Sequence, residues 1–241
     1  IGKVQLKNVL MAAIAAEKSG INISKVFNSL YYLKPIDGRL EKVGQIKNNS
    51  KVILDYAHTP DALKIVLQNL RQQFPNKKIL IVFGCGGDRD KKKRSLMGKI
   101  ANSYCDEIYL TDDNPRNENP NLIRKEIKKG IRTKKIFEIP DRKKAIKDAI
   151  INLKSSEILL VAGKGHETTQ TYKSKIRFFS DREIILKAIY KKNKSLSNNL
   201  KINVIKEISN SNLSIKKLSS NKAEINSKEV RRNDIFFTIK G

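Results

Sequence analysis

Residues 51–73 have the sequence KVILDYAHTPDALKIVLQNLRQQ, and this stretch indicates a buried strand followed closely by a helix. The apolar run at its start predicts a strand over Val52–Asp55, and the later apolar spacing predicts a helix over Pro60–Gln73. Thr59 can cap that helix, and the proline and aspartate that follow suit its first two positions. A strand that leads into a capped helix is typical of an α/β fold.

The same alternation continues along the chain. Further strands are predicted at Ile79–Phe83, Glu107–Leu110, Lys135–Ile139 and Ile158–Ala162. Further helices are predicted at Arg94–Tyr104, Asn121–Lys129, Arg142–Leu153 and Asp181–Tyr190, and two more precede the first strand at Val4–Ala16 and Ser24–Tyr31. This order predicts a Rossmann-like α/β domain with a mainly parallel sheet and helices on both faces.

The composition excludes some classes of protein. The 241 residues carry 50 Lys and Arg against 24 Asp and Glu, a net charge of +26, but the basic residues are spread along the whole chain. Binding of nucleic acid is therefore a minority interpretation, and attraction of small anionic substrates is a simpler consequence of the charge. The longest apolar runs have the length of a strand, so membrane insertion is not expected. The 2 cysteines cannot form a disulfide framework, which favours the cytoplasm.

Unusual polar residues follow four of the predicted strands. Ligands of open α/β sheets bind beyond the carboxyl ends of the strands, so these four segments are expected to form one site. The segments are Asp55-Tyr-Ala-His-Thr-Pro-Asp61, Gly84-Cys-Gly-Gly-Asp-Arg-Asp90, Thr111-Asp-Asp-Asn-Pro-Arg116 and Gly163-Lys-Gly-His-Glu167.

The third segment is the most informative about a ligand. Pro115 favours an extended Asn114, so that Asn114 and Arg116 can point into the crevice. Arginine is suited to bidentate binding of a carboxylate, and Arg89 can supply a second such group. With Glu167 as an acceptor for an ammonium group, the set would fit a zwitterionic, amino-acid-like ligand. The alternative is a surface cluster of ion pairs.

Other chemistries find less support in the residues. Neither glycine-rich segment matches the dinucleotide fingerprint or the phosphate-binding P-loop. His58 and His166 are the only histidines, and no Cys or His lies at the spacing of a metal site, so no metal ligands are predicted. Neither histidine has a nucleophilic Ser or Cys motif beside it, which makes nucleophilic hydrolysis an unlikely chemistry for this chain.

Taken together, the four segments resemble the C-terminal domain of the Mur ligase family, in the branch that adds meso-diaminopimelate to UDP-N-acetylmuramoyl-L-alanyl-D-glutamate. The resemblance covers residues 1–191 and also includes Val4-Gln-Leu-Lys-Asn-Val-Leu-Met-Ala-Ala13, which is similar to the last helical motif of the family's central ATPase domain. It implies an ATP-dependent, amide-forming ligase of peptidoglycan precursor synthesis that acts through an acyl phosphate. It also implies magnesium ions, bound mostly by the upstream domain.

The resemblance also implies roles for individual residues. Three residues match catalytic positions that contact the nucleotide or its phosphates, namely Asn8, Arg39 and Asp55. Three more are expected on the adenosine side, namely Tyr56, His58 and Asp61. The residues that match diaminopimelate contacts or complete the selectivity motif are Arg89, Asp113, Asn114, Pro115, Arg116, Gly163 and Glu167. Members of the family that add lysine replace the arginine found here at position 116, so the expected amine is meso-diaminopimelate.

The domain boundaries follow from the same resemblance. Residues 1–34 are expected to end the central ATPase domain, 35–191 to form the C-terminal domain, and 192–201, rich in Lys, Asn and Ser, to be a linker. Residues 202–241 resemble the start of the N-terminal domain of a following Mur ligase that adds D-alanyl-D-alanine, although Asn226-Ser-Lys228 stands where that family usually has Asp-Ser-Arg. This predicts a fusion of two consecutive ligases, with an incomplete α/β tail in this chain.

Three functions remain to be distinguished. The first is the ligase domain, which would need upstream ATPase and UDP-binding domains, so residues 1–241 alone are expected to be inactive. The second is a basic module that binds nucleic acid, whose affinity would fall steeply with salt. The third is a non-catalytic module that binds an anionic ligand or docks to a partner.

Overall fold

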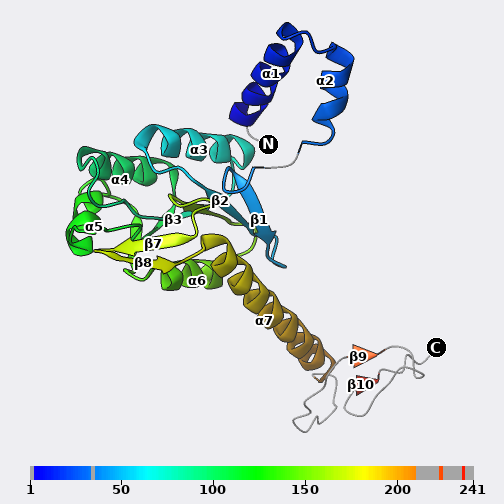
Figure 1. Ribbon diagram of the computed structural model, residues 1–241. Helices are drawn as coiled ribbons and strands as arrows, with labels where there is room; N and C mark the ends of the chain where they lie inside the picture. The colour runs from blue at the N-terminus through cyan, green and yellow to red at the C-terminus, as the bar shows by residue number, and fades with distance from the viewer. Residues whose placement is uncertain (1–2, 34–35, 210–222, 225–234, 237–241) are drawn as a thin grey trace. The chain divides into compact units, whose positions relative to one another are not determined.

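A computed structural model describes residues 3–33, 36–209, 223–224 and 235–236 of the chain (Figure 1). The chain divides into two units, residues 1–192 and 193–241. The first unit begins with two helices, α1 (Lys3–Lys18) and α2 (Ile23–Leu30), which pack against each other. Both were expected from the sequence, and the side chain of Asn22 caps the second by accepting a hydrogen bond from Ser24 N at 2.9 Å.

The centre of the first unit is a six-stranded sheet with the order β1-β2-β6-β3-β4-β5. Its strands are β1 (Glu41–Gln45), β2 (Lys51–Asp55), β3 (Ile79–Phe83), β4 (Glu107–Leu110), β5 (Lys135–Glu138) and β6 (Ile158–Ala162). All neighbouring pairs are parallel except β1 and β2, which are antiparallel. The prediction of a mainly parallel sheet is therefore confirmed.

Helices cover both faces of this sheet (Figure 1). The helices α3 (Pro60–Gln73), α4 (Lys92–Tyr104) and α5 (Pro120–Lys128) bury their apolar residues in one continuous core with alternate residues of the strands. Helix α6 (Arg142–Asn152) packs against β3, β4 and β6 from the opposite face. Because both faces are covered, the central strands β3 and β6 are buried at every position, which explains their uniformly apolar sequences.

The start of α3 agrees with the sequence prediction. The Thr59 side chain caps the helix by accepting a hydrogen bond from Ala62 N at 3.3 Å, and a proline follows at the first helical turn. This cap fixes where the chain turns away from the end of β2. It therefore also fixes the short segment between β2 and α3, which contributes to the site described below.

Three strands of the first unit were not predicted. These are β1 at the edge of the main sheet and the hairpin of β7 (Thr169–Tyr172) and β8 (Lys175–Phe178), which forms a separate antiparallel pair. Strand β1 contains a glycine, β7 is mostly polar, and β8 has only two apolar residues, so none of the three has a strong strand pattern.

The last helix is longer than expected. Helix α7 runs from Asp181 to Ser209, so residues 192–201, expected to be a linker, are helical and continue it. The sequence contains no glycine or proline between these bounds, and nothing in it interrupts the helix. Within the predicted tail, 202–241, the structure describes the last residues of α7 and two strands of two residues each, β9 (Ala223–Glu224) and β10 (Ile235–Phe236). These two strands pair in parallel. The segment 226–228 lies outside the described residues.

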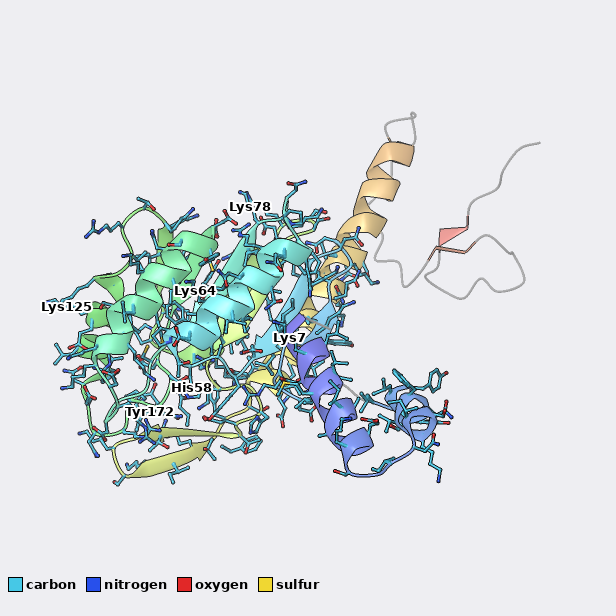
Figure 2. All side chains as sticks on the ribbon, turned by 90° about the horizontal axis from the view of Figure 1, so that it is seen from above. Lys7, His58, Lys64, Lys78, Lys125 and Tyr172 are labelled. Atoms are coloured by element: carbon cyan, nitrogen blue, oxygen red, sulfur yellow. The ribbon has the colours of Figure 1, made fainter. Side chains whose placement is uncertain are left out.

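The basic residues are distributed over the surface of the first unit. Lys64 on α3, Lys78 before β3 and Lys125 on α5 lie apart from one another in Figure 2. Such a distribution agrees with a general bias in composition. Among the described helices, none is long and apolar enough to cross a membrane.

Candidate functional site

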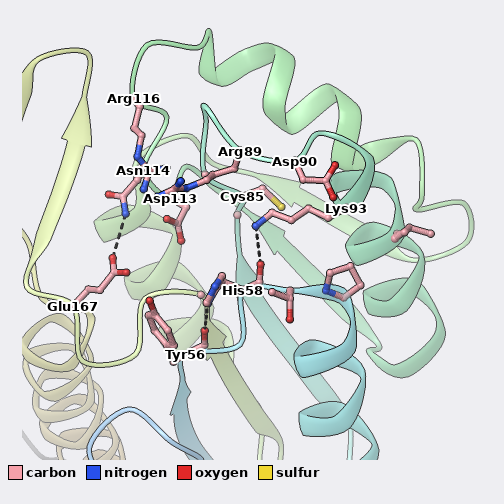
Figure 3. A pocket seen from close by; sticks show the side chains of 16 residues that line it. Tyr56, His58, Cys85, Arg89, Asp90, Lys93, Asp113, Asn114, Arg116 and Glu167 are labelled. Carbon is pink, nitrogen blue, oxygen red and sulfur yellow. Dashed lines mark hydrogen bonds between the residues drawn. The ribbon is translucent and has the colours of Figure 1, made fainter.

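A pocket of about 490 Å³ lies at the carboxyl ends of four adjacent strands, β2, β6, β3 and β4 (Figure 3). Each strand contributes the segment that follows it, as expected for an open α/β sheet. The lining residues are Tyr56, His58, Thr59, Pro60, Gly84, Cys85, Gly86, Arg89, Asp90, Lys93, Leu96, Asp113, Asn114, Arg116, Gly163 and Glu167. Cationic and anionic side chains thus line the same pocket, which suits a ligand that carries both charges.

Most of the residues predicted for the site line this pocket. From the expected nucleotide set these are Tyr56 and His58, and from the expected diaminopimelate set Arg89, Asp113, Asn114, Arg116, Gly163 and Glu167. The other predicted residues do not line the pocket. Asn8 is exposed on α1, and Asp61 is exposed in the first turn of α3. Residues next to the lining, but not part of it, are Arg39, Asp55 and Pro115.

The segment after β3 is fastened to the segment after β4. Gly87 N donates to Asn114 O at 2.9 Å, and the Arg116 guanidinium donates through Nη1 to Gly87 O at 2.8 Å. At Gly86 an added Cβ would lie 2.9 Å from the same Nη1. A larger residue at position 86 would therefore have to displace the end of the Arg116 side chain, and the backbone there does not adopt a left-handed turn.

The unpredicted β7–β8 hairpin holds the segment after β4 from the other side. Gln170 Nε2 donates to Asp113 O at 2.7 Å, and Thr171 N donates to the side-chain oxygen of Asn114 at 3.0 Å. The backbone of Arg116 also pairs with the hairpin, because its N–H donates to Thr171 O at 3.1 Å and its carbonyl accepts from Lys173 N at 2.6 Å. These bonds keep Arg116 in a left-handed conformation with a φ of 49°, which directs its side chain along the pocket wall.

A buried carboxylate supports the same segment from below. Asp112 accepts hydrogen bonds from the hydroxyl of Tyr172 at 3.0 Å and from the Arg124 guanidinium. Burial raises the pKa of Asp112 even though Arg124 lies against it. Asp112 does not line the pocket, so these contacts serve to position its neighbours.

Glu118 joins the two segments through an ion pair with a buried arginine. Its oxygens accept from both terminal nitrogens of Arg94, at 2.8 and 3.0 Å, and from Asp88 N at 2.6 Å. The side chain of Arg94 is 0% exposed. Its hydrogen bonds hold the pKa of the Glu118 carboxyl at about 2, well below the ordinary value of 4.5.

The replacement Glu118→Gln is expected to remove an acid-sensitive part of the stability. Because the folded pKa lies below the unfolded one, this contribution is complete above pH 4.5 and is lost as the pH falls toward 2. Urea unfolding of both proteins should therefore give a difference in free energy that shrinks from pH 7 to pH 3. The control is Glu183→Gln, which removes an exposed ion pair with Lys187 and should change the free energy of unfolding only slightly at every pH. A loss of stability in Glu118→Gln that does not depend on pH would contradict the prediction.

The segment after β2 forms the facing wall of the pocket. The ring of Tyr56 lies 4.6 Å from that of His58 and 5.3 Å from that of His166, and the Arg39 guanidinium stands over it at 4.8 Å. His58 is held through its backbone carbonyl, which accepts from Lys93 Nζ at 2.9 Å (Figure 3). Aromatic rings flanked by cations are suited to contacts with a flat, anionic ligand.

Asp55 has a supporting position in the structure. Its two oxygens accept hydrogen bonds from Leu40 N at 2.7 Å and from Ala57 N at 2.8 Å. The carboxyl is 4% exposed, and burial raises its pKa despite these bonds. Asp55 thus ties the turn that carries Arg39 to the end of β2.

Cys85 lines the pocket but is not suited to act as a nucleophile. Burial raises the pKa of its thiol to about 12, so the thiol is protonated at neutral pH. No motif for nucleophilic catalysis was found in the sequence either. Among the described residues, no group of three or more His, Cys, Asp or Glu is placed to hold a metal ion.

Lys93 and Leu96 line the pocket but lie outside the four predicted segments. Lys164 belongs to the fourth segment and was given no role from the sequence, but its side chain is fully buried behind the pocket lining. Its ammonium donates to Asn114 Oδ1 at 3.1 Å and to Glu167 Oε2 at 3.0 Å. The only signal in the sequence was a lysine between two glycines, Gly163 and Gly165, both of which have positive φ.

Comparison with known proteins identifies the family of this chain. The model of the family described as "Mur ligase, glutamate ligase domain" matches residues 38–165, more than half of the chain. The chain belongs to the Mur ligase family. The matched residues run from the turn before β1 to Gly165, and so include three segments of the pocket and the start of the fourth, whereas Glu167 lies just beyond the match.

Individual Mur ligases cover more of the chain. The UDP-N-acetylmuramoyl-L-alanyl-D-glutamate--2,6-diaminopimelate ligase of Rickettsia felis is 46% identical over 188 residues, which is 78% of this chain and 35% of that protein. The ligase of the same name from Buchnera aphidicola is 42% identical over 193 residues, 80% of this chain and 38% of that protein.

A solved structure of a ligase with this name superposes with a TM-score of 0.61 and 36% identity, over 78% of this chain and 39% of that one. The chain thus spans less than two fifths of the length of these relatives.

Proposed function

We propose that residues 35–191 are the amine-binding domain of an ATP-dependent ligase that joins meso-diaminopimelate to UDP-N-acetylmuramoyl-L-alanyl-D-glutamate. The observation that carries the proposal is the pocket in which Arg89, Arg116 and Glu167 come together with Asn114. The names and identities of the relatives support it. The proposed setting is peptidoglycan precursor synthesis in the cytoplasm, with roles in cell shape and division.

The pocket suits this amine by its charges. Meso-diaminopimelate has a carboxylate and an ammonium group at each end, and lysine lacks the distal carboxylate. Arg116 is held at the pocket wall by Gly87 O and by the hairpin, so its guanidinium can pair with that carboxylate at little cost in ordering. Glu167 supplies an acceptor for an ammonium group. At one end of the ligand, the carboxylate thus has Arg116 as its partner and the ammonium group has Glu167.

The proposed reaction is the one that the family resemblance implies. ATP phosphorylates the γ-carboxylate of the D-glutamyl residue, and the amine attacks the acyl phosphate. The tetrahedral intermediate then collapses to the amide with release of phosphate. Magnesium ions would neutralise phosphate charge, and Asn8, Arg39, Asp55, Tyr56, His58 and Asp61 remain the proposed nucleotide contacts. The ATPase and UDP-binding parts would correspond to the length of the relatives that this chain does not span.

Phosphate release by the full-length protein tests the proposal. The assay supplies ATP, magnesium and the UDP-muramoyl-dipeptide, with either meso-diaminopimelate or L-lysine as the amine. We expect release with diaminopimelate and little with lysine. Release with lysine alone would keep the ligase class and contradict the assigned amine. No release with either amine would contradict the ligase and favour a non-catalytic binding module.

The fusion with a following ligase stays a prediction from the resemblance of residues 202–241. The segment that carries most of that resemblance, 225–234, lies outside the described residues. The proposed ligase activity does not depend on it, because the pocket is built entirely from residues 56–167.

A further inference from the structure

The buried ammonium of Lys164 is the feature of the pocket that the proposed function leaves unexplained. The side chain is 0% exposed, does not line the pocket, and lies between the two glycines of the loop after β6. Removing an ammonium group from water is costly unless it is paired and hydrogen-bonded. Here the two partners that offset this cost are the side chains of Asn114 and Glu167, and both line the pocket.

The contact with Lys164 determines how the Asn114 amide is oriented. An ammonium group can only donate hydrogen bonds, so the amide must turn its oxygen toward it. The same oxygen accepts from Thr171 N at 3.0 Å, which leaves the amide nitrogen to donate to Glu167 Oε2 at 3.2 Å. The orientation of Asn114 is therefore determined by two donors, one on the loop after β6 and one on strand β7.

Glu167 is held by one oxygen only. Its Oε2 accepts from both Lys164 and Asn114, whereas its Oε1 accepts no hydrogen bond from any other described residue. The side chain is 32% exposed and faces the pocket (Figure 3). One carboxylate oxygen thus anchors the side chain, and the other stays available to a ligand.

We propose that Lys164 is a positioning residue, which holds Asn114 and Glu167 in place to receive an ammonium group of the amine substrate. It acts through these two side chains and does not touch the substrate. The inference rests on the proposed function of the pocket and goes beyond it by assigning a role to a residue outside the lining. It also explains why Glu167 can bind an ammonium group although it already has a lysine beside it.

Steady-state kinetics of Lys164→Met in the full-length protein test the inference. We expect the KM for meso-diaminopimelate to rise about tenfold or more, because Asn114 and Glu167 lose their common donor and the ammonium site is misplaced. The KM values for ATP and for the UDP-muramoyl-dipeptide should change less than about twofold, since only the amine is bound through this cluster. If Lys164→Met does not fold, Lys164→Gln retains one donor group and should give a smaller rise in the same KM.

A matched control is Lys192→Met. Lys192 is a half-buried lysine, whose ammonium donates to the carbonyls of Ile151 at 2.6 Å and Leu153 at 2.5 Å, away from the pocket. Its replacement should lower the melting temperature and leave the KM for diaminopimelate unchanged. The double variant Lys164→Met/Glu167→Gln should raise this KM by less than the product of the two single effects, because Lys164 acts in part through that carboxylate.

The outcomes separate the two proposals. Diaminopimelate-dependent release by the wild type with a normal KM in Lys164→Met would overturn the positioning role alone. Equal rises in all three KM values, or additive effects in the double variant, would also overturn it and indicate a purely structural lysine. Absence of diaminopimelate-dependent release in the wild type would overturn the proposed function and this inference together.

Discussion

Replacing Arg116 by methionine is expected to lower kcat/KM for meso-diaminopimelate by about 100-fold or more. Loss of one partner from a desolvated, hydrogen-bonded charge pair costs about 2–5 kcal/mol, and roughly 3 kcal/mol corresponds to 100-fold. The loss should be large here because the guanidinium is held in place before the ligand arrives. Its Nη1 donates to Gly87 O, and both backbone groups of the residue pair with the β7–β8 hairpin.

The same variant should also lose its choice between amines. Lysine has no distal carboxylate, so the kcat/KM for lysine should change much less. The ratio of the two kcat/KM values, which measures the preference for diaminopimelate, should therefore fall. Arg116→Lys keeps the charge but not the planar pair of donors, and should recover only part of the activity. Arg177→Met on the exposed strand β8 is the control and should behave as the wild type. An undiminished preference in Arg116→Met would contradict the proposed carboxylate contact.

Replacing Arg142 by methionine is expected to lower the free energy of unfolding by about 3–5 kcal/mol. Its guanidinium forms two hydrogen bonds with Asp181, at 2.9 and 2.7 Å, and a third with Ala162 O at 2.9 Å. Both charged side chains are 0% exposed. Removal of the arginine would leave the Asp181 carboxylate buried without its cation, at the first turn of α7 and beneath the end of β6.

Urea unfolding followed by far-UV circular dichroism would measure this loss, since the sequence contains no tryptophan. The double variant Arg142→Met/Asp181→Leu should recover much of the stability, because no charge is then left unpaired. Lys187→Met removes an exposed ion pair with Glu183 and should cost no more than about 0.5 kcal/mol. A loss below about 1 kcal/mol in Arg142→Met would show that the buried pair is not important for stability.

The sequence predicted the frame of the fold because that frame has strong local signals. The uniformly apolar strands β3 and β6 and the capped start of α3 at Thr59 all appear where they were expected. Strand β1 and the hairpin of β7 and β8 were missed because their residues are mostly polar or exposed. They are strands because of their partners and not because of a pattern of their own.

The last helix shows the opposite kind of error, because it was expected to end at Tyr190 and runs to Ser209. Residues 192–201 are rich in Lys, Asn and Ser, a composition typical of loops, but they continue α7. A helix ends where a residue or a cap interrupts it, and no glycine or proline does so between Asp181 and Ser209. The absence of a stop signal was therefore more informative here than the polar composition.

The sequence by itself determined the alternation of strands and helices, the four polar segments after the strands, and the resemblance to Mur ligases. Only the tertiary structure decided that β6 lies between β2 and β3, which brings the last of these segments into the middle of the pocket. It also decided that Lys164 binds Asn114, 50 residues away in the sequence, and that the hairpin holds Arg116. Strand order and side-chain partners depend on contacts between distant residues, whereas patterns in a single sequence report mainly on neighbours.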